Sequence, residues 1–233
     1  MVIRLFLKLE RFWAKTSSGR FTRYLRRKGI SVGEGVCWNP QTCLIDLTRP
    51  SLISIGNNCF FNSNFTLLTH DWVSNVFLNA KMGFVNSSGK VVIGDNVSFG
   101  RNVMVLKNVT IGNNCFIGAG SIVTTNIPPN SIAVGAPCRV VMSIDDYFKK
   151  RVKKSEEEAF EYARSIKERF NREPVASDFW EEFVWFVDGN KIDDYPEIPI
   201  KKQLGSFYTD YKKYHHAKYN GFVDFLHEAL KQK

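Results

Sequence analysis

The chain has 233 residues, of which 44% are hydrophobic, and this suits one domain of ordinary size with an appendage. No run approaches the roughly 18 apolar residues of a membrane span, and the start lacks the charge, apolar block and cleavage-site order of a signal peptide, so we expect a cytoplasmic protein. The five cysteines form no Cys-x-x-Cys pair and are expected to be reduced packing residues.

The basic charge is concentrated in residues 1–29, which we predict to form a basic amphipathic helical segment. Residues 1–28 contain nine Lys or Arg and one acidic residue, Glu10, so they carry +8 of the net charge of +9. Apolar side chains follow helical spacing on one face, and they are Val2, Leu5, Phe6, Leu9, Phe12 and Trp13. The opposite face holds Arg4, Lys8, Arg11 and Lys15.

Such a helix either makes a peripheral contact with the anionic inner face of a membrane through residues 1–28, or packs on the body of the protein with its charges in water. Nucleic acid is not expected as a partner, because the aromatic residues lie on the apolar face and not among the basic residues.

Over residues 93–123 an apolar residue returns at every sixth position, and four of these are followed directly by glycine. The repeating positions are Ile93, Phe99, Val105, Ile111, Ile117 and Val123. A period of six fits neither a helix nor an alternating strand, and a short fixed repeat predicts the stacked coils of a parallel β-helix. Two earlier coils are predicted, one with Val32, Trp38 and Leu44 and one with Ile55, Phe61 and Leu67.

The repeat is interrupted after Leu67 and resumes at Ile93, which predicts an inserted loop over 71–90. Loops inserted into a repeat array usually carry its binding face. His70 lies at the edge of this loop and is the only one of the four histidines within the repeats. A neutral imidazole accepts a proton at cytosolic pH, so His70 is a candidate general base, although a lone loop histidine is more often a plain surface residue.

Beyond Ser143 the period of six disappears. Residues 144–233 are predicted to form a helical, aromatic-rich extension to the β-helix domain of residues 30–143. One helix is expected over 144–171, a second around 177–187 with Gly189 at its end, and a third near 221–230.

Residues 91–141, with the ending Gly-x-Pro-Cys-Arg-Val at 135–140, resemble the C-terminal coils of the hexapeptide acyltransferases. They are especially similar to the galactoside and maltose O-acetyltransferase branch, and residues 44–72 resemble acetyltransferases that decorate surface polysaccharides. The resemblance implies a mainly β fold, in which a left-handed parallel β-helix of hexapeptide repeats lies between the two helical segments. It also implies a homotrimer with active sites between subunits.

The same resemblance implies acetyl-CoA as the acyl donor, a sugar or glycan acceptor, and no metal. His70 matches the catalytic histidine of the family at the start of the loop, and its orienting partner is expected from another strand or subunit. Acceptor contacts are expected from Asn39, Asp46 and Asp71. The coenzyme A contacts of the galactoside branch fall on Ala119, Thr124, Thr125 and Arg139. Arg101 is added as a phosphate partner, because this chain has Thr125 where the family often has lysine.

The sequence therefore predicts an acetyl-CoA-dependent O-acetyltransferase that acts on a sugar hydroxyl, of a surface polysaccharide or its precursor. An N-acyltransferase of an amino sugar and a xenobiotic acetyltransferase are the enzymatic alternatives, and a non-catalytic β-helix scaffold is the alternative from another class. A zinc site like that of the γ carbonic anhydrases is not expected, because it needs three converging histidines and the coils contain one.

Overall fold

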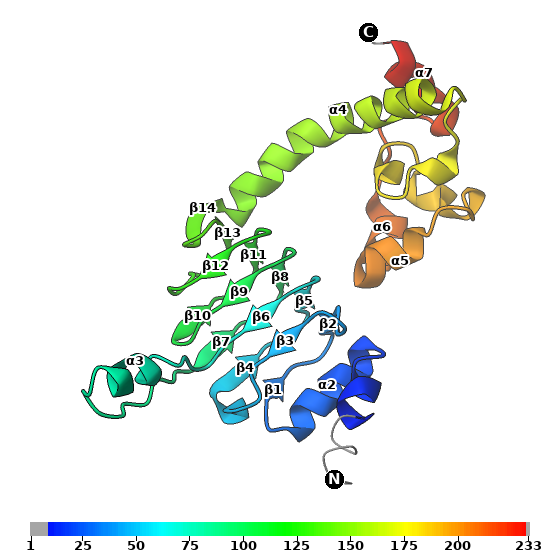
Figure 1. Ribbon diagram of the computed structural model, residues 1–233. Coiled ribbons are helices and arrows are strands. Elements are labelled where there is room, and N and C mark those ends of the chain that lie inside the picture. The colour runs from blue at the N-terminus through cyan, green and yellow to red at the C-terminus, as the bar shows by residue number, and fades with distance from the viewer. Residues whose placement is uncertain (1–8, 232–233) are drawn as a thin grey trace. The chain divides into compact units, whose positions relative to one another are not determined.

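The computed structural model describes residues 9–231 of the chain (Figure 1). Its contacts divide the chain into two compact units, Met1–Tyr147 and Phe148–Lys233. The first unit holds all the strands of the described residues, and the second is helical. Among residues 9–231, no helix is both long enough and apolar enough to cross a membrane.

Three sheets of parallel strands form the first unit, and from β1 to β12 each sheet receives every third strand. Sheet A contains β1 (Ser31–Val32), β4 (Ile53–Ile55), β7 (Val91–Ile93) and β10 (Val109–Ile111). Sheet B contains β2 (Cys37–Trp38), β5 (Phe60–Phe61), β8 (Val97–Phe99), β11 (Cys115–Ile117) and β13 (Ser131–Val134), with β14 (Arg139–Ser143) antiparallel to β13. Sheet C contains β3 (Leu44–Ile45), β6 (Thr66–Leu67), β9 (Met104–Val105) and β12 (Ile122–Val123).

The chain thus steps from sheet to sheet in turn, as Figure 1 shows, and this path is consistent with the left-handed β-helix that was expected. Helices make up the second unit, so the chain as a whole is mixed α/β and the expectation of a mainly β fold was too narrow.

The inner face of sheet C corrects the register that was predicted for the first coil. Ile45 pairs with Leu67, and both are buried. Leu44 pairs with Thr66 and is exposed, although the repeat placed it inside. The reason is that Ile45 follows Trp38 by seven positions, so the first coil has one residue more than a strict period of six allows.

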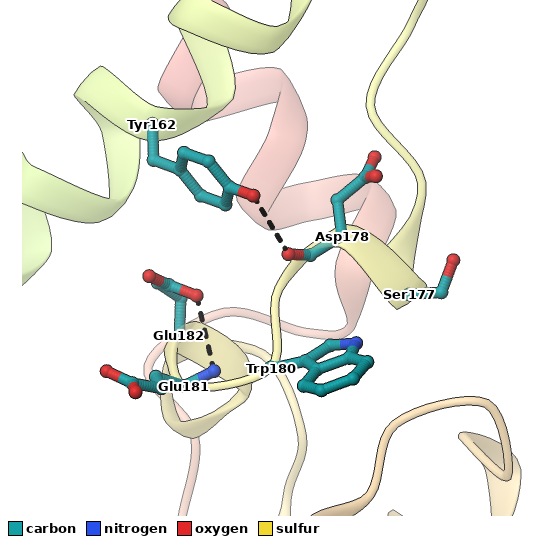
Figure 2. Close-up of a pocket in the computed structure, with 6 residues that line it drawn as sticks. All are labelled: Tyr162, Ser177, Asp178, Trp180, Glu181 and Glu182. Carbon is teal, nitrogen blue, oxygen red and sulfur yellow. Dashed lines mark hydrogen bonds between the residues drawn. The ribbon is translucent and has the colours of Figure 1, made fainter. Parts of the chain in front are cut away.

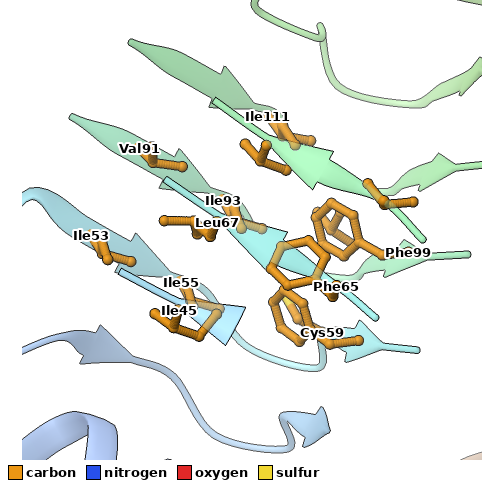
Figure 3. Close-up of a cluster of buried hydrophobic side chains, with 14 of the residues drawn as sticks. Ile45, Ile53, Ile55, Cys59, Phe65, Leu67, Val91, Ile93, Phe99 and Ile111 are labelled. Carbon is orange, nitrogen blue, oxygen red and sulfur yellow. The ribbon is translucent and has the colours of Figure 1, made fainter. Parts of the chain in front are cut away.

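Aromatic rings fill the early coils. The rings of Trp38 and Phe61 stack with their centroids 4.0 Å apart, and those of Phe61 and Phe99 stack at 5.0 Å. Phe65 contacts Phe61 and Phe99, and Figure 3 shows Phe65 and Phe99 beside the aliphatic side chains of the same coils. Because truncating a buried aromatic residue costs about 3–5 kcal/mol, these rings contribute strongly to the stability of the coils.

Asparagines occupy the corners between strands in the left-handed backbone conformation. Seven of them have φ between 54° and 62°, namely Asn58, Asn64, Asn96, Asn102, Asn108, Asn114 and Asn130. Asparagine visits this region more readily than other residues with a Cβ, because its amide bonds locally. Asn96 donates to Asn114, which donates to Asn130, so the corner amides also link successive coils.

The cysteines are all free. Four are buried as predicted, and burial raises the pKa of Cys43 to about 11. Cys37 is exposed, so its predicted packing role is wrong. Trp38 points into the core, and neighbouring residues of a strand face opposite sides.

The N-terminal segment contains two helical pieces rather than one helix. Residues 9–14 are helical, and α2 (Ser18–Arg27) follows after a turn. Ser17 caps α2 by accepting a hydrogen bond from the Arg20 N–H, and Phe21 on its buried face meets Trp38 edge-on at 5.3 Å. The predicted helix positions Val2, Arg4, Leu5, Phe6 and Lys8 lie outside the described residues.

The inserted loop leaves the coils after β6 and contains α3 (Ser74–Asn79), which projects beyond the sheets in Figure 1. An antiparallel bridge between His70 and Ser88 pairs the two ends of the loop. The apolar side chains of the loop are mostly exposed, and they include Trp72, Val76, Leu78, Met82, Phe84 and Val85.

The C-terminal unit has its own core, in which Phe160, Phe179 and Phe225 are buried. α4 (Ile144–Phe170) and α7 (Phe222–Lys231) confirm two of the predicted helices. The helix predicted around 177–187 is wrong, because this stretch forms the short 3-10 helices η2 (Ala176–Asp178) and η3 (Glu182–Trp185). Gly189 begins a further one, η4 (Gly189–Asp194), and a Cβ there would lie 2.5 Å from the Tyr211 carbonyl oxygen.

The remaining helices of this unit are α5 (Ile200–Leu204), η5 (Gly205–Phe207) and α6 (Tyr208–Tyr214), and the first unit has the short η1 (Pro50–Leu52).

Candidate active site

Residues from four coils meet where the strands of sheet C end. Asp46 follows β3, His70 comes three residues after β6, Lys107 comes two residues after β9, and Thr124 follows β12. The pairing of Ile45 with Leu67, of Leu67 with Val105 and of Val105 with Val123 stacks these strand ends. Side chains far apart in the sequence therefore share one corner of the coils.

A histidine and a buried carboxylate form the centre of this corner. His70 Nδ1 lies 2.6 Å from Asp46 Oδ2, and the side chains are 16% and 4% exposed. An ionised carboxylate only accepts hydrogen bonds, so the imidazole Nδ1 donates and carries its proton. Nε2 of the neutral ring is then the nitrogen that accepts a proton, which is the tautomer that a general base requires.

Asp46 is ionised because many donors surround it. Its carboxylate accepts hydrogen bonds from the backbone N–H and the hydroxyl of both Thr48 and Thr69, in addition to His70. Burial by itself raises the pKa of this carboxyl, but the donors, led by Thr69 and Thr48, hold the pKa of Asp46 well below its ordinary value. The sequence predicted Asp46 as an acceptor contact, whereas the structure places it against the imidazole.

A cavity of about 440 Å³ opens beside His70. It is lined by Thr48, Arg49, His70, Asp71, Trp72, Ser74, Phe84, Asn86 and Ser87. The Trp72 ring stands edge-on to the imidazole at a centroid distance of 5.9 Å. Arg49 donates to the Thr48 hydroxyl and has no acidic partner within residues 9–231. The cavity therefore combines aromatic walls, one uncompensated cation and a candidate base.

Asp71 fastens the loop that forms one wall of this cavity. Its carboxylate lies 2.6 Å from Lys107 Nζ and accepts hydrogen bonds from Ser87 Oγ and the Val73 N–H. Lys107 also contacts the Ser87 hydroxyl. The hydrogen bond from Lys107 lowers the pKa of Asp71 to about 2. Asp71 thus ties both ends of the loop to the next coil, while its contact with an acceptor stays a prediction.

The residues predicted for coenzyme A divide between two corners of the coils. Thr124 and Thr125 follow β12 at the corner of His70. Ala119 and Arg101 lie together where sheet B passes to sheet C, since the Gly120 N–H donates to the Arg101 carbonyl. Arg139 begins β14 opposite Val134, at the end of β13.

All five of these side chains are exposed, and neither arginine has an acidic partner in the part of the chain that the structure describes. Small side chains beside free guanidinium groups suit a phosphate-bearing, extended ligand such as coenzyme A. Their contact with coenzyme A stays a prediction.

Asn39 does not line the cavity of His70 in the same chain. Its amide donates to the Ser63 hydroxyl at 2.7 Å, and it lines a different cavity with Pro40, Phe60 and Asn62.

Sequence reasoning missed Arg49, Trp72 and the two threonines that bind Asp46. Trp72 had a signal, because an aromatic residue follows the candidate histidine closely in the loop. The others had none, since their roles depend on the stacking of the segment after β3 against the segment after β6.

A second cavity, of about 450 Å³, lies in the C-terminal unit and is shown in Figure 2. It is lined by Tyr162, Ser177, Asp178, Trp180, Glu181 and Glu182. Arg172 binds the Asp178 carboxylate, and no histidine, cysteine or lysine lines the cavity. Its carboxylates are not paired with an imidazole as Asp46 is with His70, so the His70 cavity is the better candidate for catalysis. Within residues 9–231, no three or more His, Cys, Asp or Glu side chains are grouped to hold a metal ion.

Comparison with known proteins shows what the coils are similar to. The family model "Bacterial transferase hexapeptide (six repeats)" matches residues 90–125. Galactoside O-acetyltransferase of Escherichia coli K12 is 42% identical over 127 residues, which are 52% of this chain and 59% of the relative. Galactoside O-acetyltransferase of Lactococcus lactis is 36% identical over 119 residues, 51% of this chain and 55% of the relative.

Among solved structures, a maltose O-acetyltransferase from Clostridium difficile 630 is similar, with 26% identity, a TM-score of 0.41, and coverage of 60% of this chain and 85% of that one. The chain spans little more than half the length of the two curated relatives. The repeat region of the chain is therefore similar to the bacterial transferase hexapeptide model and to galactoside O-acetyltransferases.

Proposed function

We propose that the chain transfers an acetyl group from acetyl-CoA to a sugar hydroxyl, with His70 as the general base. The observation that carries this proposal is the 2.6 Å contact between His70 Nδ1 and the buried Asp46 carboxylate at the wall of a cavity. This contact fixes the tautomer and leaves Nε2 to accept a proton. The acetyltransferase relatives supply the reaction class.

In the proposed reaction, His70 Nε2 takes the proton of the acceptor hydroxyl while the hydroxyl oxygen attacks the thioester carbonyl carbon. The carbon–sulfur bond then breaks, and the imidazolium returns the proton to the departing thiolate. The products are an acetyl ester of the sugar and the free thiol. Asp46 remains ionised and stabilises the imidazolium between the two transfers. General base catalysis of this kind contributes roughly 10²–10⁴-fold to a rate.

The lining of the cavity supports a sugar acceptor. Trp72 and Phe84 expose ring faces against which the C–H groups of a pyranose pack. Arg49 adds a positive charge that no carboxylate of residues 9–231 neutralises. We therefore favour an acceptor with a carboxylate or phosphate near the reacting hydroxyl, as surface polysaccharides and their phosphate-linked precursors can provide. Asp71 is the proposed contact within the chain, and Asn39 would contact the acceptor only from a neighbouring subunit.

For the donor, we propose that Thr124 and Thr125 border the pantetheine arm and that Arg139 or Arg101 meets the phosphate groups. Ala119 would lie on the same ligand. Because these residues occupy two corners of one chain, a single ligand contacts all of them most simply between two subunits.

We further propose a homotrimer. Exposed apolar side chains on the outer face of sheet C, Leu44 and Ile122, and those of the inserted loop would be covered by neighbouring subunits. Light scattering that gives the mass of a monomer would contradict this.

The test is a thiol-release assay with a panel of hydroxyl and amine acceptors. His70→Gln should lower kcat by about 10²-fold or more without changing the Kd of acetyl-CoA. His216→Gln is the matched control, because that side chain is 85% exposed and lies outside the candidate site. A preference for amine acceptors would support an N-acyltransferase instead. Binding of acetyl-CoA with no His70-dependent turnover on any acceptor would support the non-catalytic scaffold.

A further inference from the structure

The apolar face of the first helical piece points away from the protein. Leu9, Phe12 and Trp13 are 57%, 73% and 50% exposed, and their spacing of three and four residues puts them on one side of a helix. The helix packs on the body through its other side, where Ala14 is fully buried and Glu10 binds Arg27 and Lys28. The described part of the apolar face is therefore not used for packing within the chain.

Uncompensated cations lie beside these apolar side chains. Arg11 and Lys15 line a cavity of about 430 Å³ together with Phe12, Thr16 and Gln41. Burial, followed by the charge of Arg11, lowers the pKa of Lys15. The two neighbouring positive charges would favour an anionic ligand here. The Arg20 guanidinium stands over the Trp13 ring at 4.5 Å.

The basic residues of the N-terminal segment differ in whether they have an acidic partner. Arg26, Arg27 and Lys28 form ion pairs with Glu34 or Glu10. The four basic residues Arg11, Lys15, Arg20 and Arg23 have no acidic partner within residues 9–231. These four residues, with Leu9, Phe12 and Trp13, are called the N-terminal docking surface below.

We propose that the N-terminal docking surface binds an anionic phospholipid bilayer. The aromatic rings would lie at the level of the headgroups, where Trp and Phe are favourable, and the guanidinium and ammonium groups would reach the lipid phosphates. A bilayer fits better than a protein groove, because the surface joins a narrow apolar stripe to flanking cations, all of one sign. The inference does not depend on the acetyl transfer, and it would place the enzyme beside lipid-linked acceptors.

Sedimentation of the full chain with vesicles tests the proposal. Vesicles of phosphatidylcholine alone should bind it weakly, and vesicles with about one third phosphatidylglycerol should bind it strongly and in a salt-sensitive way. Phe12→Ser with Trp13→Ser should weaken binding by about tenfold or more. Arg11→Gln with Arg23→Gln should lose about fivefold per cation, on anionic vesicles only.

Matched controls are available in the C-terminal unit. Trp180→Ser with Phe207→Ser removes two other exposed aromatic residues, and Lys149→Gln with Lys153→Gln removes two other exposed cations. Both control pairs should bind vesicles as the parent does. Equal losses in test and control variants, or no binding of the parent to anionic vesicles, would overturn the proposal.

If the variant with both Phe12→Ser and Trp13→Ser does not fold, tryptophan fluorescence provides an independent test. Brominated lipids should quench part of the tryptophan emission of the parent but less of that of Trp13→Phe. Equal quenching would show that Trp13 stays out of the bilayer and overturn the proposal. A Phe12→Ser variant that binds vesicles normally but loses subunits in light scattering would instead assign the surface to a second copy of the chain.

Discussion

Asp46→Asn is the substitution that examines the candidate site most directly. The carboxylate accepts two hydrogen bonds from Thr48 at Oδ1 and three at Oδ2, from Thr69 and His70. The new amide has only one oxygen. Because more donors point at Oδ2, we expect the amide oxygen to stay there and keep the imidazole in its tautomer, while the amide nitrogen faces the donors of Thr48.

The magnitude follows from the charge that is removed. A hydrogen bond to a charged group contributes about 1.5–3 kcal/mol, and the imidazolium formed during catalysis loses that stabilisation. At about 1.4 kcal/mol for each tenfold change in rate, kcat should fall by roughly 10- to 150-fold. The Thr48 N–H loses its acceptor, whereas the Thr48 hydroxyl can turn and accept a hydrogen bond from the new amide. The free energy of unfolding should therefore fall by about 1 kcal/mol.

The assay is initial-rate thiol release at saturating acetyl-CoA, with the free energy of unfolding measured by denaturant titration. Asp95→Asn is the matched control, since Asp95 also accepts hydrogen bonds at a coil corner, from the backbone and amide of Asn57, but lies outside the candidate site. If Asp46→Asn turned over within twofold of the parent while remaining folded, the assignment of Asp46 as the partner of a catalytic base would be refuted.

Four further outcomes are expected. The folded-state pKa of Asp46 lies below its unfolded value of about 3.9, so the stability that its ionisation contributes is lost as the pH falls through the folded value. The difference in unfolding free energy between the parent and Asp46→Asn, measured by denaturant titration, should therefore shrink as the pH falls below about 4. Lys107→Met should free the Asp71 end of the inserted loop and raise the acceptor KM severalfold, more than kcat changes, whereas Lys107→Arg should restore much of the affinity. Arg49→Gln should lower kcat/KM about tenfold for an acceptor with a carboxylate or phosphate and leave a neutral sugar nearly unchanged, and equal losses on both would exclude recognition of charge by Arg49. Phe61→Ala should lower the free energy of unfolding by about 3–5 kcal/mol in a denaturant titration, because its ring is fully buried between Trp38 and Phe99.

The repeat was readable from the sequence because the cross-section of a stacked coil imposes a fixed period. Phe99, Val105 and Ile117 occupy the inward positions of their strands, and all are buried as the period of six predicts. The same logic failed at Leu44, where one extra residue in the first coil moved the inward position to Ile45. A period predicts average geometry, and an insertion of one residue leaves no mark that periodicity can detect.

The C-terminal unit was less readable. The helix α4 has a clear helical period, but residues 176–194 form 3-10 helices around buried aromatic residues such as Phe179 and Phe183. Aromatic and β-branched residues are weak helix formers, and their strand preference depends on context, so tertiary packing decides the backbone of this stretch. The family resemblance did not extend to this stretch.

The pairing of His70 with Asp46 depends on the extra residue in the first coil, which was not predicted from the period of six. Because Ile45 and not Leu44 pairs with Leu67, Asp46 is the first residue after the inward position and is level with Leu68 at the strand end. From there its carboxylate reaches the Thr69 N–H and the imidazole beyond it. If Leu44 had paired with Leu67, Ile45 would be level with Leu68, and Asp46 would lie one residue beyond it. Two departures from the repeat thus form the site together. The extra residue of the first coil positions the Asp46 carboxylate, and the interruption after the second coil lets His70 lie outside the strands.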